Sequence, residues 1–285
     1  MEVIDSEMHP VLTSSSGVVQ VSYDELIKCM DNNKIDQAVI LPSWKFENGP
    51  ARVIEEVAKR NPKRLIPFCK FFYDKPPLPG GWGDQKERAL RELNQMLSSG
   101  VFKGVGEINL GENHAEDPYR AVREYFPFMD IIAKFKVPVE FHTGFGFSGP
   151  LPFLDPKPLD ILASTYPEIP FLINHCGYML PPFGDISLYM AMENDNVYLQ
   201  ISNLHLIKDQ PGRELYKKWV SNALAGYGVG AGKLIFGTDW IPAHEGEREN
   251  DPEVSYHVKA LSEIKMSEDE RSMVMGGNLK KLLRI

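Results

Sequence analysis

Eight short apolar runs recur along the chain, and stretches with helical character separate them. The runs are Val3–His9, Asp36–Leu41, Arg64–Phe71, Val101–Asn109, Val137–Thr143, Phe171–His175, Val197–Ile201 and Leu234–Thr238. Several of them lack an alternation of polar and apolar residues, which is typical of parallel strands that are covered on both faces. Strands that alternate with helices predict an α/β fold with a parallel sheet, either closed into a (β/α)8 TIM barrel or open and doubly wound.

The segments between the runs carry helix start signals. Ser22–Glu25 and Ser267–Glu270 have the spacing of a capping box. Asp117–Pro118 and Asp251–Pro252 each combine an N-cap residue with a proline at the first helical position. Further helices are predicted at Ala51–Arg60, Lys86–Ser99, Leu159–Tyr166, Ile186–Glu193 and Arg213–Ala225.

A closed barrel is the favoured form of this sheet. No GxGxxG motif follows the first run, which weakens the dinucleotide-binding version of an open sheet. The 285 residues fit one barrel of roughly 250 residues with short insertions. Because no repeat, low-complexity tract or linker divides the sequence, we predict a single barrel domain over residues 1–285.

Charge and cysteine usage narrow the partners and the compartment. The net charge of −8, without a cluster of Lys and Arg, argues against nucleic acid as a partner. Cys29, Cys69 and Cys176 are too few and too far apart for a disulfide framework, which indicates a reducing compartment. The first residues show no secretory leader, and no apolar run approaches the ~20 residues that span a bilayer. We therefore expect a cytoplasmic protein without membrane attachment.

Residues that bind metals stand at the ends of four predicted strands. Glu7 and His9 are two apart on the first run, so both side chains face one side. His142 ends the fifth run, His175 ends the sixth, and Asp239 follows the eighth. In a closed barrel these strand ends meet at one face, and such a mixture of imidazole and carboxylate donors suits a divalent metal. Each residue alone has an ordinary structural explanation, but together they predict a shared metal site.

The motifs around these residues resemble the amidohydrolase superfamily, and in particular the amidohydrolase-related branch that includes aminocarboxymuconate-semialdehyde decarboxylase and the resorcylate-type decarboxylases. The resemblance covers nearly the whole chain and includes the first-strand motif, NHCG around His175, GTDW at Asp239 and the closing GGNLKKLL. Most members carry HxH on the first strand, whereas this chain has Glu7-Met8-His9. A Glu-x-His version occurs in the aromatic-acid decarboxylases of the branch, which favours that reaction.

By this resemblance, Glu7, His9, His142 and Asp239 bind one divalent ion, Zn²⁺ or Mn²⁺, and His175 donates or accepts a proton beside it. A small-molecule substrate is implied, favoured to be an aromatic or unsaturated carboxylic acid that loses carbon dioxide while Asp239, in its acid form, protonates the ring carbon. The alternative is hydrolysis of a lactone, ester or amide by water that the metal activates, with Asp239 taking the proton. Branch members also suggest a homo-oligomer, by analogy alone.

Several loop residues are candidates for walls of the substrate site. Each follows a predicted strand, and loops at that end of a barrel build the active site. The candidates are Trp44, Phe145, Tyr178, His205, Trp240 and His244. Glu107 either points to the same end of the barrel or pairs with a lysine such as Lys103, and the sequence leaves both options open. It also leaves open whether the loop of residues 73–83, which is rich in proline, closes over the site.

Two rival classes remain. A non-catalytic barrel that only binds a small molecule predicts degraded metal ligands, and here only the first-strand glutamate is unusual. A metal-free aldolase needs a Schiff-base lysine, for which Lys70 near the end of the third run is the candidate. The metal content of the protein separates both rivals from a metal-dependent enzyme.

Overall fold

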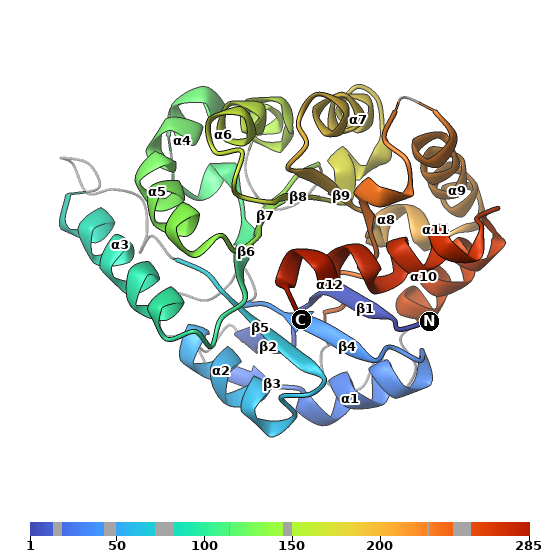
Figure 1. The fold of residues 1–285 in the computed structure, drawn as a ribbon, viewed down its shortest axis with the longest axis horizontal. Helices are drawn as coiled ribbons and strands as arrows, with labels where there is room; N and C mark the ends of the chain where they lie inside the picture. The colour runs from blue at the N-terminus through green and yellow to red at the C-terminus, as the bar shows by residue number, and fades with distance from the viewer. Residues whose placement is uncertain are drawn as a thin grey trace.

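The computed structural model describes residues 1–13, 19–42, 50–71, 83–113, 115–144, 150–226, 228–241 and 252–285. Eight parallel strands lie side by side in a nearly closed barrel, in the order β1-β4-β5-β6-β7-β8-β9-β10, and helices surround them (Figure 1). The strands are β1 (Ile4–Met8), β4 (Gln37–Ile40), β5 (Leu65–Cys69), β6 (Gly104–Ile108), β7 (Val139–His142), β8 (Phe171–Asn174), β9 (Val197–Gln200) and β10 (Leu234–Ile235). The predicted (β/α)8 barrel is thus confirmed, and each of the eight predicted runs contains one of its strands.

Most of the helices fall on the predicted segments, whereas the fifth, eighth and twelfth helices below were not predicted. They are α1 (Tyr23–Asn32), α2 (Pro50–Arg60), α3 (Gly83–Ser98), α4 (Pro118–Glu124), α5 (Phe126–Phe135), α6 (Asp160–Thr165), α7 (Phe183–Glu193), α8 (Leu204–Ile207), α9 (Gln210–Ala225), α10 (Pro252–Glu263), α11 (Glu268–Ser272) and α12 (Asn278–Leu283). Asp117 caps α4 by accepting from two backbone N–H groups, and Ser267 with Glu270 forms a complete capping box at α11. Ser22 precedes α1 as predicted but makes no side-chain cap hydrogen bond.

A two-stranded antiparallel sheet was not predicted. It pairs β2 (Val11–Thr13) with β3 (Val19–Val21), directly after the first barrel strand. Its strands are three residues long, too short to give a clear alternation in the sequence. Among the described residues, no helix is both long and apolar enough to cross a membrane.

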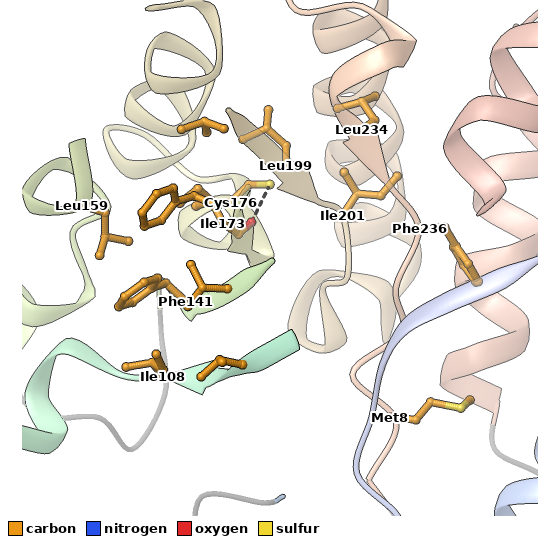
Figure 2. Packing of buried hydrophobic residues seen from close by; sticks show 14 of the residues in the cluster. Met8, Ile108, Phe141, Leu159, Ile173, Cys176, Leu199, Ile201, Leu234 and Phe236 are labelled. Carbon is orange, nitrogen blue, oxygen red and sulfur yellow. Dashed lines mark hydrogen bonds between the residues drawn. The ribbon is translucent and has the colours of Figure 1, made fainter. Parts of the chain in front are cut away.

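In several strands, neighbouring residues enter two separate apolar clusters. The outward-facing residues pack beneath the surrounding helices, as Phe141, Ile173 and Leu199 do in Figure 2. The inward-facing residues form a smaller cluster inside the barrel, to which α12 (labelled in Figure 1) contributes Leu279 and Leu283. Its other members are Ile4, Val39, Leu41, Ile66, Phe68, Leu172 and Ile235. Helix α12 therefore completes the barrel interior.

A seam joins the first and last strands of the barrel. β1 and β10 share no ladder in the described structure, and an isolated parallel bridge between Met8 and Trp240 joins them beyond the end of β10. The amide of His9 donates to the carbonyl of Trp240 at 2.7 Å, and the hydroxyl of Thr238 donates to Asp5 at 2.6 Å. These contacts hold the chain after β10 against β1.

Candidate metal centre

Two groups of metal-binding side chains lie at the C-terminal ends of the barrel strands. Glu7, His9 and Asp239 form one group, and their potential ligand atoms all lie within 4.8 Å of one another. Glu107, His142 and His175 form the second group by the same measure. The structure therefore brings together the predicted residues of the first strand with Asp239, and places His142 beside His175 and Glu107.

A shift in strand register points Glu7 and His9 into the barrel. Ile4 belongs to the inner apolar cluster, yet Glu7, three residues later, also faces inward, although side chains alternate along a regular strand. The pairing of β1 with β4 is irregular between Asp5 and Met8, and such a bulge changes which face later residues take. The irregularity thus aims two donors at the interior from one strand.

The first group converges on the ring of His9. Its Nε2 atom lies 3.4 Å from an oxygen of Asp239 and 3.7 Å from an oxygen of Glu7. The side chain of Glu7 is fully buried, whereas that of Asp239 keeps 12% of its surface exposed. The group is therefore open on the side of Asp239.

The second group is tighter. Nδ1 of His142 lies 2.9 Å from Oε1 of Glu107, and Nε2 of His175 lies 3.1 Å from the same oxygen. The two ring nitrogens are themselves 3.1 Å apart. Three donor atoms from three successive strands thus face a common point.

Amide and hydroxyl groups link the two groups. The amide nitrogen of Asn174 lies 2.9 Å from Glu7 and 3.4 Å from Glu107, so it can donate to both carboxylates. Gln200 and Ser202 also donate to Glu7. The two donor groups are therefore parts of one buried polar array.

The array favours protons on His9 and His175 when no cation is bound. Burial alone would lower the pKa of His9, but its hydrogen bonds to Asp239 and Glu7 raise that pKa well above its usual value. Burial likewise works against a charged His175, yet the charge of Glu7 and the hydrogen bond to Glu107 raise the pKa of His175 to about 9. A divalent ion would displace such protons, since only deprotonated ligands bind metal.

The carboxyl groups differ in charge state. Burial tends to raise the pKa of Glu107, but the neighbouring rings of His142 and His175 hold it well below its usual value. Burial raises the pKa of Glu7, and the charge of Glu107 adds to the shift. Burial also raises the pKa of Glu140, a fully buried residue whose two oxygens have no hydrogen-bond partner in the described structure. Among Glu7, Glu107 and Glu140, Glu107 is therefore the one whose charged form its surroundings favour most.

An unusual left-handed turn carries His175 and Tyr178. Five successive residues, His175–Met179, have positive φ values between 50° and 61°, and all but one of them are not glycine. The amide of Gly177 donates to the hydroxyl of Thr143 at 2.8 Å, which ties the turn to β7. The turn stacks the ring of Tyr178 on that of His175, with 5.3 Å between centroids. Strained conformations of this kind persist where surrounding contacts hold them, often at functional sites.

Two of the predicted substrate-wall residues can be placed. Tyr178 stacks on His175, and Trp240 is buried beside β1, next to Asp239. Trp44, Phe145 and His244 lie outside the described residues, as do the loop of residues 73–82 and the side chain of His205, whose backbone belongs to helix α8. Contact with a substrate stays a prediction for all six residues.

Sequence reasoning left Glu107 undecided and did not single out the residues that support the donors. Glu107 faces the two histidines, while the ammonium group of Lys103 donates to the carbonyl of Gly100. Asn174, Gln200 and Ser202 each stand at or just beyond the end of a strand, which is the signal that could have marked them.

The fold and the donor groups define a (β/α)8-barrel enzyme of the amidohydrolase superfamily. The amidohydrolase family model matches residues 48–285, so this chain belongs to that metal-dependent family. The matched region includes Glu107, His142, His175 and Asp239, and begins after Glu7 and His9. A search among curated protein sequences finds none that matches.

Solved structures with the same fold include enzymes of two reaction types. A probable 2-pyrone-4,6-dicarboxylic acid hydrolase from Acinetobacter baumannii, with citric acid bound, is 17% identical with a TM-score of 0.65, covering 100% of both chains. A 5-carboxyvanillate decarboxylase from Sphingomonas paucimobilis is 13% identical with a TM-score of 0.64, covering 100% of this chain and 99% of the other. A zinc-bound amidohydrolase from Burkholderia multivorans is 14% identical with a TM-score of 0.67, covering 100% of both chains.

Proposed function

We propose that this protein is a metal-dependent enzyme that removes carbon dioxide from a small aromatic or unsaturated carboxylic acid. The observation that carries the proposal is the convergence of Glu7, His9 and Asp239 from opposite ends of the sequence onto one buried site. The family assignment supports it, because the family is metal-dependent. The decarboxylase and the citrate-bound hydrolase among the structural relatives support a carboxylic acid as the substrate.

The residues present fit a divalent ion, Zn²⁺ or Mn²⁺. Two carboxylates and one imidazole, all buried, suit either metal, and a site with three protein ligands leaves room for a substrate atom. His142 is the predicted fourth ligand. When bound, the ion would supply positive charge that polarises a substrate oxygen or carboxylate.

The exposed edges of the site support a role for Asp239 in the proton transfer. Asp239 and His142 keep 12% and 11% of their side-chain surface exposed, whereas Glu7 and His175 keep 0% and 1%. A substrate therefore meets Asp239 and His142 first. Asp239 is placed to deliver a proton to the carbon that loses carbon dioxide, while Glu7 stays fixed by Asn174, Gln200 and Ser202.

Hydrolysis of a lactone, ester or amide is the second candidate. It uses the same residues, with Asp239 accepting a proton from water instead of donating one to carbon. The 2-pyrone-4,6-dicarboxylic acid hydrolase among the structural relatives favours this reaction. Glu7 in the place of the more common first-strand histidine favours decarboxylation.

The test begins with the metal content of protein purified without chelator, followed by a panel of hydroxybenzoates and lactones. We expect bound Mn or Zn and release of carbon dioxide from one of the hydroxybenzoates. An Asp239→Asn variant should lose both. The matched control is His257→Asn, because His257 is a buried histidine in α10, outside the two donor groups.

The outcomes are distinct. Ring opening of a lactone without release of carbon dioxide would replace the proposed reaction by the hydrolytic one. Absence of metal after reconstitution with both Mn²⁺ and Zn²⁺ would contradict the proposal as a whole.

A further inference from the structure

A pocket lies at the end of the barrel opposite the two donor groups. Its volume is about 560 Å³, which falls in the range of roughly 300–1,000 Å³ typical of small-molecule sites. Gln37, the first residue of β4, and Leu65–Pro67, the first three residues of β5, line it. The barrel strands are parallel and the donor groups stand at their C-terminal ends, so this pocket belongs to the other face of the barrel.

The walls of the pocket come from regular elements of the fold. Glu55, Ala58 and Lys59 are three and four residues apart in α2, so they share one face of that helix, which packs beside β5 (Figure 1). The segment before β6 forms another wall, and the amide of Lys103 ties it to β5 by donating to the carbonyl of Pro67 at 2.9 Å. The remaining lining residues are Pro62, Lys63, Gly100, Val101 and Ile285.

The inner surface of the pocket is aliphatic. Ala58 and Leu65 are buried members of the larger apolar cluster, and Ile66 belongs to the cluster inside the barrel. Val101 is half-buried beside them. A ligand with an apolar body would lose contact with water against these side chains, which favours binding.

The rim of the pocket carries more positive than negative charge. Lys59 pairs with Glu55 at 2.6 Å, so these two charges compensate each other. The ammonium of Lys103 donates to the neutral carbonyl of Gly100 at 2.9 Å, which fixes its position without neutralising it. Within the described part of the chain, the ammonium of Lys63 has no hydrogen-bond or ion-pair partner. Two positive charges, those of Lys63 and Lys103, are therefore uncompensated.

This local charge is opposite in sign to that of the whole protein. The chain has a net charge of −8, whereas its three lysines and one glutamate give the pocket a positive balance. A terminal carboxylate on Ile285 would reduce that balance by one and leave it positive. Charges of one sign beside a low-dielectric wall attract ligands of the opposite sign. The pocket therefore suits an anion.

We propose that this pocket is a second small-molecule site, which binds an organic acid with an apolar body. The body lies on Ala58, Leu65 and Ile66, and the carboxylate faces Lys63 and Lys103. No lining residue belongs to either donor group, so binding here needs no metal and does not depend on the proposed reaction.

The experiment is calorimetric titration with 2-naphthoate, compared with 2-naphthamide, which has the same ring system without the charge. A carboxylate can also bind at the metal centre, so both the metal-loaded and the metal-stripped protein are titrated. We expect one 2-naphthoate per chain to bind after metal removal, and binding to weaken as salt is added. We expect 2-naphthamide to bind about tenfold more weakly, because it lacks the attraction to two ammonium groups.

Variants locate the binding. The double variant Lys63→Gln/Lys103→Gln should bind 2-naphthoate about tenfold more weakly than the wild type. The matched control is Lys134→Gln/Lys265→Gln, which removes the same charge from two exposed lysines outside the pocket and should bind as the wild type does. Val101→Trp keeps every lysine but fills the pocket, and it should abolish this binding.

The outcomes separate this site from the metal centre. Binding of 2-naphthoate only when metal is present would overturn the second site and leave the proposed function intact. Equal weakening in the two double variants would assign the effect to overall charge and also overturn it. Binding that neither Lys63→Gln/Lys103→Gln nor Val101→Trp weakens would place the ligand elsewhere. Equal affinity for 2-naphthamide would contradict an anion as the ligand.

Discussion

The barrel interior has two layers with opposite chemistry. In one layer, side chains such as Ile4, Phe68 and Leu172 pack with residues of α12 in an apolar cluster. Near the strand ends, the same inward-facing positions hold carboxylates, imidazoles and amides. Along β8, Leu172 of the first layer lies two positions before Asn174 of the second, with only Ile173 between them. One barrel thus divides its interior between stability and chemistry.

The polar layer carries costs that the apolar layer does not. Buried atoms without a hydrogen-bond partner in the described residues include Nδ1 of His9, Oδ1 of Asn174 and both oxygens of Glu140. Leaving such groups unpaired costs about 1–3 kcal/mol each. The left-handed turn at His175–Met179 lies at the same end. We infer that the apolar layer offsets a site that is selected for reactivity, as expected for strand ends in this fold.

The largest predicted effect is on the polar layer. Asp239→Asn removes a carboxylate from the first donor group, so we expect activity on any accepted substrate to fall about 10³-fold or more, because metal charge stabilisation is worth several kcal/mol. The metal-free variant should unfold close to the temperature of the metal-free wild type, because the change removes both a like charge near Glu7 and the partner of His9. Steady-state kinetics and thermal unfolding check both. A large drop in the unfolding temperature of the metal-free variant would contradict the view that the polar layer contributes little to stability.

The next effect is on the apolar layer. Phe68→Ala leaves a cavity inside the barrel, and we expect the free energy of unfolding to fall by about 3–5 kcal/mol. Metal content per folded molecule should stay at the wild-type value, because Phe68 belongs to the other layer. Denaturant titration and elemental analysis of the folded fraction measure the two quantities. Loss of metal without loss of stability would contradict the comparison.

A smaller effect is expected from Ser202→Ala, which removes the partner of His175 Nδ1 and a donor to Glu7. Support of this kind is worth about 10–100-fold in metal affinity. Competition with a fluorescent chelator measures it. The control is Ser187→Ala, which removes a buried hydroxyl that bonds the carbonyl of Phe183 within α7 and should leave affinity unchanged. An equal loss in both variants would assign the effect to packing.

The smallest effect tests how closely the apolar layer is packed. A Cβ atom at Gly104 would lie 2.3 Å from the ring of Phe68, so Gly104→Ala should cost about 1–3 kcal/mol of stability. In the Phe68→Ala background the clash is absent, and the two losses should not add. Denaturant titration of both single variants and the double variant decides this. Additive losses would show that Gly104 matters for another reason.

The periodic features of the fold could be predicted from sequence. Eight apolar runs gave eight strands, and the caps at Asp117 and Ser267 form as expected. These signals are local, because they depend on side chains within a few residues of one another. The antiparallel pair of β2 and β3 was not predicted, because its strands are too short to show an alternation of polar and apolar residues.

The residue types of the candidate site could be predicted from the sequence, but which of these residues lie together could not. Glu7, His9 and Asp239 converge as expected, whereas His142 faces Glu107 and His175. Register irregularities in β1 and β6 decide which side chains face inward. The local sequence carries no pattern from which such a bulge could be predicted. The left-handed turn after β8 could not be predicted from the sequence either, because four of its five residues are types that rarely adopt that conformation. These features depend on contacts between strands far apart in the chain.

The seam between β1 and β10 means that metal binding by the first donor group would also affect the closure of the barrel. Glu7 and His9 stand on one side of the seam, and Asp239 stands on the other, where a single bridge and a few hydrogen bonds join the two sides. An ion bound by Glu7, His9 and Asp239 would link β1 to the segment after β10, where the hydrogen-bond ladder of the barrel is interrupted. Binding of metal and closure of the barrel would then be one event, and the amides along β1 would exchange with solvent at a rate set by the metal concentration.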